Sequence, residues 1–307
     1  MTFTISLKEE ISKRESNMVE ENSELLAYLL AVGKFSNNLL TLTNENASVT
    51  RRIYKDLKEV YSINPIVTVR IQKRFRVKQI YILSVKEKIN LIKSSLEMYK
   101  IGAIKTLVTD EERIAFLMGS FLAVGTVSDP KSKGYHLEFS LNKESYARNI
   151  NQILKYYHFM SKIIKRGNKF IVYIKSSEDI SDLIKMFGAT NSLFYFEDIR
   201  IYRDHKNMVN RLNNCEVANQ EKTISTGLKQ IETINYLKKN DLLSLLDEKT
   251  LIVMEMREKY PEVSFQELAN IISMETDYKI GKSGINHHFI KMNEIVSRHK
   301  KNKNEKI

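Results

Sequence analysis

A segment near the N-terminus occurs again in the middle of the chain, and this repeat restricts the fold more than any other feature. The segment LLAYLLAVG (Leu25 to Gly33) returns as LMGSFLAVG (Leu117 to Gly125), with the tripeptide AVG identical in both. Small residues lie four positions apart in each copy, so they share one helical face and let two helices approach closely. They are Ala27 and Ala31 in the first copy, and Gly119 and Ala123 in the second. The glycine that closes each copy is the residue type that most readily ends a helix in the left-handed conformation.

After each copy, the hydrophobic pattern changes to the alternation that is typical of strands, with amphipathic helices between them. The expected strands are LLTLT, PIVTVRI and KQIYILSV after the first copy, and YHLEFSL, MSKIIKR and KFIVYIKSS after the second. The order of elements is therefore the same twice. We predict a pseudo-twofold α+β domain over residues 1–205, with repeats at about residues 20–100 and 112–190 that pack through their first helices.

The net positive charge of the chain indicates that its binding partner is anionic. Its 307 residues carry a formal charge of +12, an excess of Lys and Arg that attracts nucleic acid or an anionic membrane surface. No apolar run approaches the ~20 residues needed to span a bilayer, and the charged N-terminus MTFTISLKEEISKRE lacks the apolar stretch of a signal peptide. We therefore expect a cytoplasmic, nucleoid-associated protein without membrane insertion.

Residues 206–240 are polar and helical in pattern, which predicts a helical linker between two domains. Four asparagines in it are either helix caps or contacts to a partner, and we favour caps: Asn210, Asn213, Asn214 and Asn219. The only cysteine is Cys215, so an internal disulfide and a cysteine-based zinc site are excluded. We interpret it as a buried, inert thiol.

Residues 241–307 contain helical patterns and no strand pattern, which predicts an all-α domain. Ser264 and Glu267 have the spacing of a capping box, just after Pro261 ends the preceding helix. A turn around Thr276 to Ile280 leads into the basic segment GKSGINHHFIKMNEIVSRHKK. Helix, short turn and basic helix are the layout of a helix-turn-helix.

The last helix has an apolar face and a polar, basic one. Its apolar residues, Ile285, Phe289, Met292 and Val296, recur every three or four positions and should pack inward. The residues that we place against double-stranded DNA, as base or backbone contacts, are Ser264, Lys282, Ser283, Asn286, His287, His288, Lys291 and Arg298. The alternative is a solvated basic helix without a partner; we favour DNA because the layout and the charge agree. Adjacent His287 and His288 diverge by about 100° on a helix, so we expect no metal there.

The repeated helices resemble the LAGLIDADG motifs of homing endonucleases. In that family, an acidic residue before the last glycine of each motif holds the divalent metal that activates water. Val32 and Val124 occupy these positions here, and valine can neither ligate a metal nor carry a proton. Asp129 follows the second copy in the sequence SDP, where a turn residue is the simpler interpretation. We therefore predict no catalytic residue, no metal, no cofactor and no enzymatic activity.

A degenerate LAGLIDADG-like domain followed by a helix-turn-helix resembles the WhiA family of bacterial regulators. The resemblance lies in FLMGSFLAVGTVSDPKSKGYHLEF (Phe116 to Phe139), NRLNNCEVANQEKT (Asn210 to Thr223) and KSGINHHFIKMNEI (Lys282 to Ile295). It implies a transcription factor-like, DNA-binding protein in cell division and chromosome segregation, and in sporulation where the organism forms spores. The DNA-reading element of the family corresponds to residues 264–297, whereas the asparagine-rich stretch receives no role.

Two other functions stay open from the sequence. The N-terminal domain could serve as a scaffold that binds a protein of the division or transcription machinery, or the chain could be a residual nuclease. A basic hairpin, RIQKRFRVK, is a second candidate DNA contact through Arg70, Lys73, Arg74, Arg76 and Lys78. A solvated turn explains this basic hairpin equally well.

Overall fold

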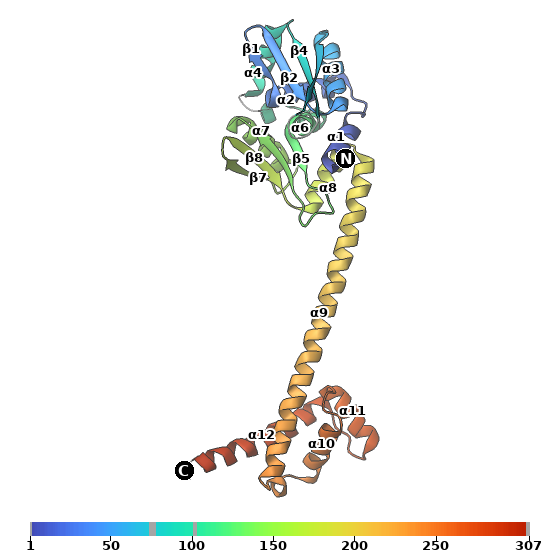
Figure 1. The fold of residues 1–307 in the computed structure, drawn as a ribbon, viewed down its shortest axis with the longest axis vertical. Coiled ribbons are helices and arrows are strands. Elements are labelled where there is room, and N and C mark those ends of the chain that lie inside the picture. The colour runs from blue at the N-terminus through green and yellow to red at the C-terminus, as the bar shows by residue number, and fades with distance from the viewer. Residues whose placement is uncertain (1, 74–77, 101–102, 305–307) are drawn as a thin grey trace. The chain divides into compact units, whose positions relative to one another are not determined.

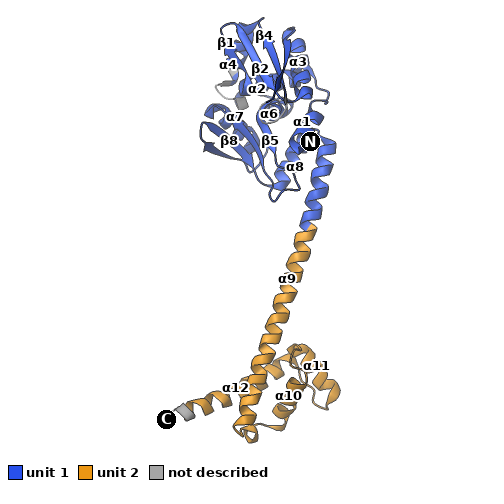
Figure 2. Cartoon of the chain, in the orientation of Figure 1, with its two compact units in different colours: residues 1–204 blue, residues 205–307 orange. Residues whose placement is uncertain are grey.

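The computed structural model describes residues 2–73, 78–100 and 103–304. The chain forms two compact units, residues 1–204 and residues 205–307, coloured separately in Figure 2. We call them unit 1 and unit 2 and describe each by itself.

Unit 1 contains the two repeats, preceded by a short helix α1 (Phe3–Ile11). The first repeat consists of α2 (Met18–Val32), β1 (Lys34–Ser36), β2 (Leu39–Asn44), α3 (Ala47–Tyr61), β3 (Ile66–Gln72), β4 (Lys78–Val85) and α4 (Ile89–Lys100). The second, after α5 (Ala103–Thr106), consists of α6 (Asp110–Val124), β5 (Gly125–Val127), β6 (Leu137–Leu141), α7 (Glu144–Tyr156), β7 (Lys162–Arg166), β8 (Lys169–Ile174) and α8 (Ser177–Met186). The predicted α+β fold with an internal repeat is confirmed.

The two sheets have the same topology. Each has four antiparallel strands, in the order β1-β2-β4-β3 in the first repeat and β5-β6-β8-β7 in the second; they are the blue-to-cyan and the green sheets of Figure 1. Alternate residues of the inner strands are buried, as Leu40 and Leu42 are in β2 and Phe139 is in β6, so one face of each sheet packs on the core. Strands β3 and β7 form corresponding edges.

Helices α2 and α6 pack closely along the centre of unit 1. Both begin with a capping box, Asn17 with Glu20 and Thr109 with Glu112, which satisfies backbone donors at the helix start. A Cβ atom on Gly119 would lie 2.1 Å from the Glu24 carbonyl oxygen. Only glycine therefore permits this separation of the two backbones, as the small residues of the repeat predicted.

The glycines that end α2 and α6 do not adopt the expected left-handed conformation. Gly33 has φ −63° and ψ 121°, and Gly125 has φ −73° and ψ 144°. Each helix leads directly into a short strand, β1 or β5, so the backbone turns into the extended region instead. Lack of space explains the glycines better: a Cβ would lie 2.5 Å from the Leu29 carbonyl oxygen at Gly33 and 2.2 Å from the Phe121 ring at Gly125.

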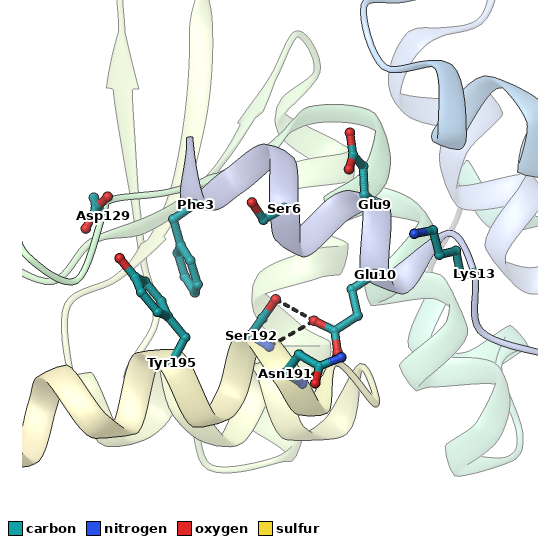
Figure 3. A pocket seen from close by; sticks show the side chains of 9 residues that line it. All are labelled: Phe3, Ser6, Glu9, Glu10, Lys13, Asp129, Asn191, Ser192 and Tyr195. Carbon is teal, nitrogen blue, oxygen red and sulfur yellow. Dashed lines mark hydrogen bonds between the residues drawn. The ribbon is translucent and has the colours of Figure 1, made fainter. Parts of the chain in front are cut away.

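Helix α1 packs on the core of unit 1. This helix was not predicted from the sequence, because the segment is rich in charged residues. Phe3, Leu7 and Ile11 are buried on one face. On the other side, the Glu10 carboxylate accepts hydrogen bonds from the N–H and hydroxyl of Ser192 at 2.9 and 2.6 Å (Figure 3). It also accepts one from the backbone N–H of Asn191 at 2.7 Å. It thereby caps the start of helix α9 (Thr190–Lys239) with a negative charge, where the helix dipole favours one.

Unit 2 consists of helices around a separate core. The later part of α9 is followed by a 3₁₀ turn η1 (Leu243–Leu245), α10 (Glu248–Lys259), α11 (Phe265–Glu275) and α12 (Lys282–Asn304). Its buried residues come from all four α-helices and the η1 region: Ile234, Leu237, Leu246, Val253, Met254, Leu268, Ala269, Ile272, Ile285, Phe289, Met292 and Val296. An all-α C-terminal unit is therefore confirmed.

Two expectations for residues 206–240 are wrong. Helix α9 runs without a break from Thr190 to Lys239, so Asn210, Asn213, Asn214 and Asn219 lie inside a helix and cannot be caps. Cys215 is exposed rather than buried, as are all residues of α9 from 204 to 222.

Candidate nucleic-acid interface

The first turns of α12 combine a buried apolar stripe with an exposed polar face. Ile285, Phe289, Met292 and Val296 all belong to the core of unit 2, which confirms the predicted inward stripe. Four of the predicted contact residues are exposed at this end of the helix: Lys282, Ser283, Asn286 and His287. Their side chains offer ammonium, hydroxyl, amide and imidazole groups, which hydrogen-bond to phosphates and base edges.

Helix α11 and the following turn hold α12 in place. Ser264 caps α11 in the predicted box: the Glu267 N–H donates to its hydroxyl at 3.2 Å, and its own N–H donates to the Glu267 carboxylate at 2.8 Å. In the turn, the Thr276 hydroxyl donates to the Ile272 carbonyl at 2.7 Å and accepts from the Tyr278 N–H at 3.2 Å. The Phe289 ring stacks on the Phe265 ring with centroids 6.0 Å apart. These contacts fix the orientation of α12 and of its exposed face.

Besides Ser264, two more of the predicted contact residues already have partners within unit 2. Half-buried His288 lies between Thr250 and Tyr278, with Nδ1 at 2.8 Å from the threonine hydroxyl and Nε2 at 3.0 Å from the tyrosine hydroxyl. Burial lowers the pKa of His288. Lys291 forms a 2.6 Å ion pair with Asp247, and this contact holds the pKa of Asp247 below its usual range. Both residues attach α12 to the start of α10, whereas Arg298, further along α12, is exposed.

In unit 1, the two motif positions at which the nuclease family carries its acids hold Val32 and Val124. Val32 and Val124 pack against the core there. The buried Glu24 lies about two turns earlier on α2, where its carboxylate accepts from Arg52 Nε at 2.5 Å and Nη2 at 2.8 Å. Within the described ranges, no three His, Cys, Asp or Glu side chains gather to hold a metal ion. Asp129 accepts a hydrogen bond from the Lys131 N–H at 2.9 Å, which confirms its role in a turn.

The basic hairpin between β3 and β4 is described only in part. Arg70, in β3, and Lys73 are exposed. Lys78 begins β4, and Arg74 and Arg76 lie outside the described residues. The geometry brings Arg70 and Lys73 to the surface of unit 1 without showing a contact for either.

Sequence reasoning missed one cation in unit 2. Arg257 is 1% exposed and lines a hollow together with Lys222 of α9 and Lys282 of α12. A signal was present in the sequence: Arg257 follows the apolar Val253 and Met254 by four and three positions, so a helix through this region must turn the arginine toward the core.

Comparison with known proteins identifies the family. The chain is 33% identical over 317 aligned residues to the "Probable cell division protein WhiA" of Clostridium botulinum (strain Hall), covering 96% of this chain and 98% of that protein. The chain belongs to the WhiA family. The same name is given to a protein of Bacillus cytotoxicus that is 37% identical, with 97% of each chain covered.

Domain profiles of the WhiA family cover most of the chain. The WhiA N-terminal LAGLIDADG-like domain matches residues 19–99, the WhiA LAGLIDADG-like domain matches residues 113–206, and the WhiA C-terminal HTH domain matches residues 209–296. The fold is similar to that of full-length WhiA from Thermatoga maritima, with a TM-score of 0.58 and 24% identity over 97% of this chain and 99% of that one. None of the described helices is both long and apolar enough to cross a bilayer.

Proposed function

We propose that this WhiA-family protein is a sequence-specific, transcription factor-like DNA-binding regulator of cell division and chromosome segregation. It acts without nuclease activity or cofactor and associates with the nucleoid. The observation that carries the proposal is the exposed polar face at the start of α12, formed by Lys282, Ser283, Asn286 and His287 on a packed helix-turn-helix. Amide and ammonium groups on such a helix hydrogen-bond to base edges in the major groove. The role in division follows the name of the relatives.

The absence of nuclease activity is supported by where the carboxylates of unit 1 lie. Hydrolysis by the LAGLIDADG route needs an acid at the end of each central helix to hold a metal, and Val32 and Val124 supply none. Glu24, the fully buried acid of α2, is already engaged by Arg52 in a two-pronged ion pair. Both oxygens of this carboxylate therefore contact the Arg52 guanidinium.

Selection of bound duplexes from fragmented genomic DNA, with the full-length chain, tests the proposal. A shared sequence motif should be enriched, and the selected duplex should stay intact during long incubation with Mg²⁺ or Mn²⁺. Binding without an enriched motif would contradict sequence-specific regulation, and strand nicking that depends on the metal would contradict the non-enzymatic role.

A second candidate, binding of a protein partner by unit 1, is favoured by the edge strand β3. All seven of its residues are exposed, and its apolar side chains Ile66, Val67, Val69 and Ile71 are 49–56% exposed. The corresponding edge strand β7 has the sequence KIIKR, whose charges discourage strand addition. An unprotected apolar edge accepts an extended segment of another protein as a further strand.

Photo-crosslinking in cells tests this second candidate. A crosslinker in place of Val69 should give one discrete adduct of higher mass, and a crosslinker in place of Ile164 on β7 should not. Equal adducts from both positions, or none from Val69, would contradict a partner site at β3.

A further inference from the structure

Among the described residues that line the hollow around Arg257 in unit 2, three are cations and none is acidic. The hollow measures about 400 Å³ and is bounded by Lys222, Arg257 and Lys282, with polar or apolar neutral side chains between them: Asn219, Thr223, Thr226, Val263, Ser264, Phe265 and Gln266. We name it the α9–α12 hollow. The lining residues come from α9, α10, the turn before α11, α11 itself and the first residue of α12, all within unit 2.

The position of Arg257 is fixed by its surroundings. Its Nη1 donates to the carbonyl oxygens of Tyr260, Pro261 and Val263 at 3.2, 3.4 and 2.7 Å. Its guanidinium also lies 5.7 and 5.9 Å from the ring centroids of Phe265 and Phe289, a distance suited to cation–π attraction.

Gly227 of α9 completes this arrangement. A Cβ atom at this position would lie 2.0 Å from the Pro261 carbonyl oxygen. The helix can therefore approach the turn that holds Arg257 only because residue 227 is glycine. The approach brings Lys222, five residues earlier on α9, to the same hollow.

The charge of Arg257 is not balanced within the protein. Among the described residues, no carboxylate lies within ion-pairing distance of it, and its buried Nε has no hydrogen-bond partner. Burial lowers the pKa of Arg257, which means that removal from water disfavours its charged form. A buried charge without a counter-ion is costly, and an anion in the hollow would reduce that cost.

The Glu267 side chain, in the first turn of α11, is engaged in the capping box. Its carboxylate accepts the Ser264 N–H at 2.8 Å. The hydroxyls of Thr223 and Thr226 donate back to carbonyl oxygens of α9, at Asn219 and Lys222. The attraction for an anion therefore comes from the three cations.

We propose that the α9–α12 hollow binds a phosphate group, and that the backbone of the DNA bound at α12 supplies it. This inference rests on the proposed function. Lys282 stands at the start of α12 and in the hollow at once, so DNA that meets Asn286 and His287 also passes the hollow. Lys222 then contacts one phosphate, to which the buried charge of Arg257 adds attraction. Helix α9 becomes part of the DNA-binding surface as a backbone contact that positions α12 without reading sequence.

Duplex binding by the full-length chain across a salt series tests the proposal. Lys222→Ala should weaken binding about five- to tenfold for every sequence and lower the slope of log K against log salt by about one, the effect of losing one phosphate contact. Arg257→Lys, which keeps the charge but loses the planar donors, should also weaken binding while circular dichroism shows a folded chain. Lys229→Ala, on the same helix but outside the hollow, should match the wild type.

The outcomes separate this inference from the proposed function. Wild-type binding that Lys222→Ala leaves unchanged in affinity and slope overturns the DNA contact while the proposed function stands. Thermal unfolding with inorganic phosphate, against chloride at equal ionic strength, then decides the source: protection of the wild type but not of Lys222→Ala shows a site for a free phosphoryl group. No protection overturns the site altogether. If the wild type binds no DNA, the proposed function fails, and the phosphate measurement alone decides the hollow.

Discussion

The ends of the central helices in unit 1 and the start of α12 in unit 2 have opposite characters. At Val32 and Val124, a place that resembles a nuclease centre presents aliphatic side chains packed on the core. At Lys282 and Asn286, the helix presents exposed polar groups on a support that fixes their direction. Similarity of unit 1 to a nuclease fold therefore does not imply nuclease chemistry. Function has to be argued from the residues at each site.

The close packing of α2 and α6 holds unit 1 together. Disrupting it should give the largest loss of stability. Gly119→Ala places a methyl group 2.1 Å from the Glu24 carbonyl oxygen, so the two helices must separate. We expect unit 1 to lose about 2–4 kcal/mol of unfolding free energy, measured by urea denaturation. Gly134→Ala, where a Cβ meets nothing within 4 Å, is the control; equal losses in both variants would show that the close approach is unimportant.

Restoring the acids should sharpen the contrast between the two regions. Val32→Asp with Val124→Asp puts carboxylates into a half-buried, apolar place and should cost about 1–3 kcal/mol of stability. We expect no nicking of bound DNA with Mg²⁺, because we place the DNA against α12 and not at these helix ends. Cleavage of supercoiled plasmid by the double variant would contradict this expectation. It would show that a phosphodiester binds at the ends of α2 and α6.

The buried carboxylates of unit 1 should give an effect that depends on pH. Burial, with the nearby Glu24 charge, raises the pKa of Asp56 to about 8, against about 3.9 in an unfolded chain. The folded state therefore keeps a proton that the unfolded state releases, and the wild type loses stability as pH rises from about 4 to about 8.

Asp56→Asn cannot ionise, so its advantage over the wild type should grow across that window. We expect a gain in unfolding free energy and in Tm at pH 8, and a smaller gain at pH 5. Asp182→Asn, at an exposed position, is the control. An advantage that stays constant with pH would contradict a raised pKa at Asp56.

Much of unit 1 follows from the sequence because its pattern is long and occurs twice. The predicted strand KQIYILSV coincides with β4 and LLTLT lacks only one residue of β2, since alternation over five or more residues is a strong signal. Strands β1 and β5 have three residues each and are too short to alternate visibly. Helix α1 was not predicted, although Phe3, Leu7 and Ile11 recur every four positions. The charged residues of this segment made the apolar spacing hard to recognise.

The candidate site also has features that the sequence predicts and features that it does not. The buried stripe of α12 was predictable from spacing within one helix. The engagement of His288 by Thr250 and Tyr278 was not, since it depends on which helices meet. The α9–α12 hollow joins Lys222 and Lys282, far apart in sequence, and only the packing of Gly227 against Pro261 brings them together.

Anisotropy of a labelled target duplex across a salt series, with variants of each unit in the full-length chain, tests the central claim most directly. Lys282→Ala with Asn286→Ala should weaken binding by about 1–3 kcal/mol per lost contact, whereas Arg70→Ala with Lys73→Ala in unit 1 should leave both affinity and salt slope unchanged. The opposite pattern, with binding lost only in the unit 1 variant, would contradict the assignment of DNA binding to α12.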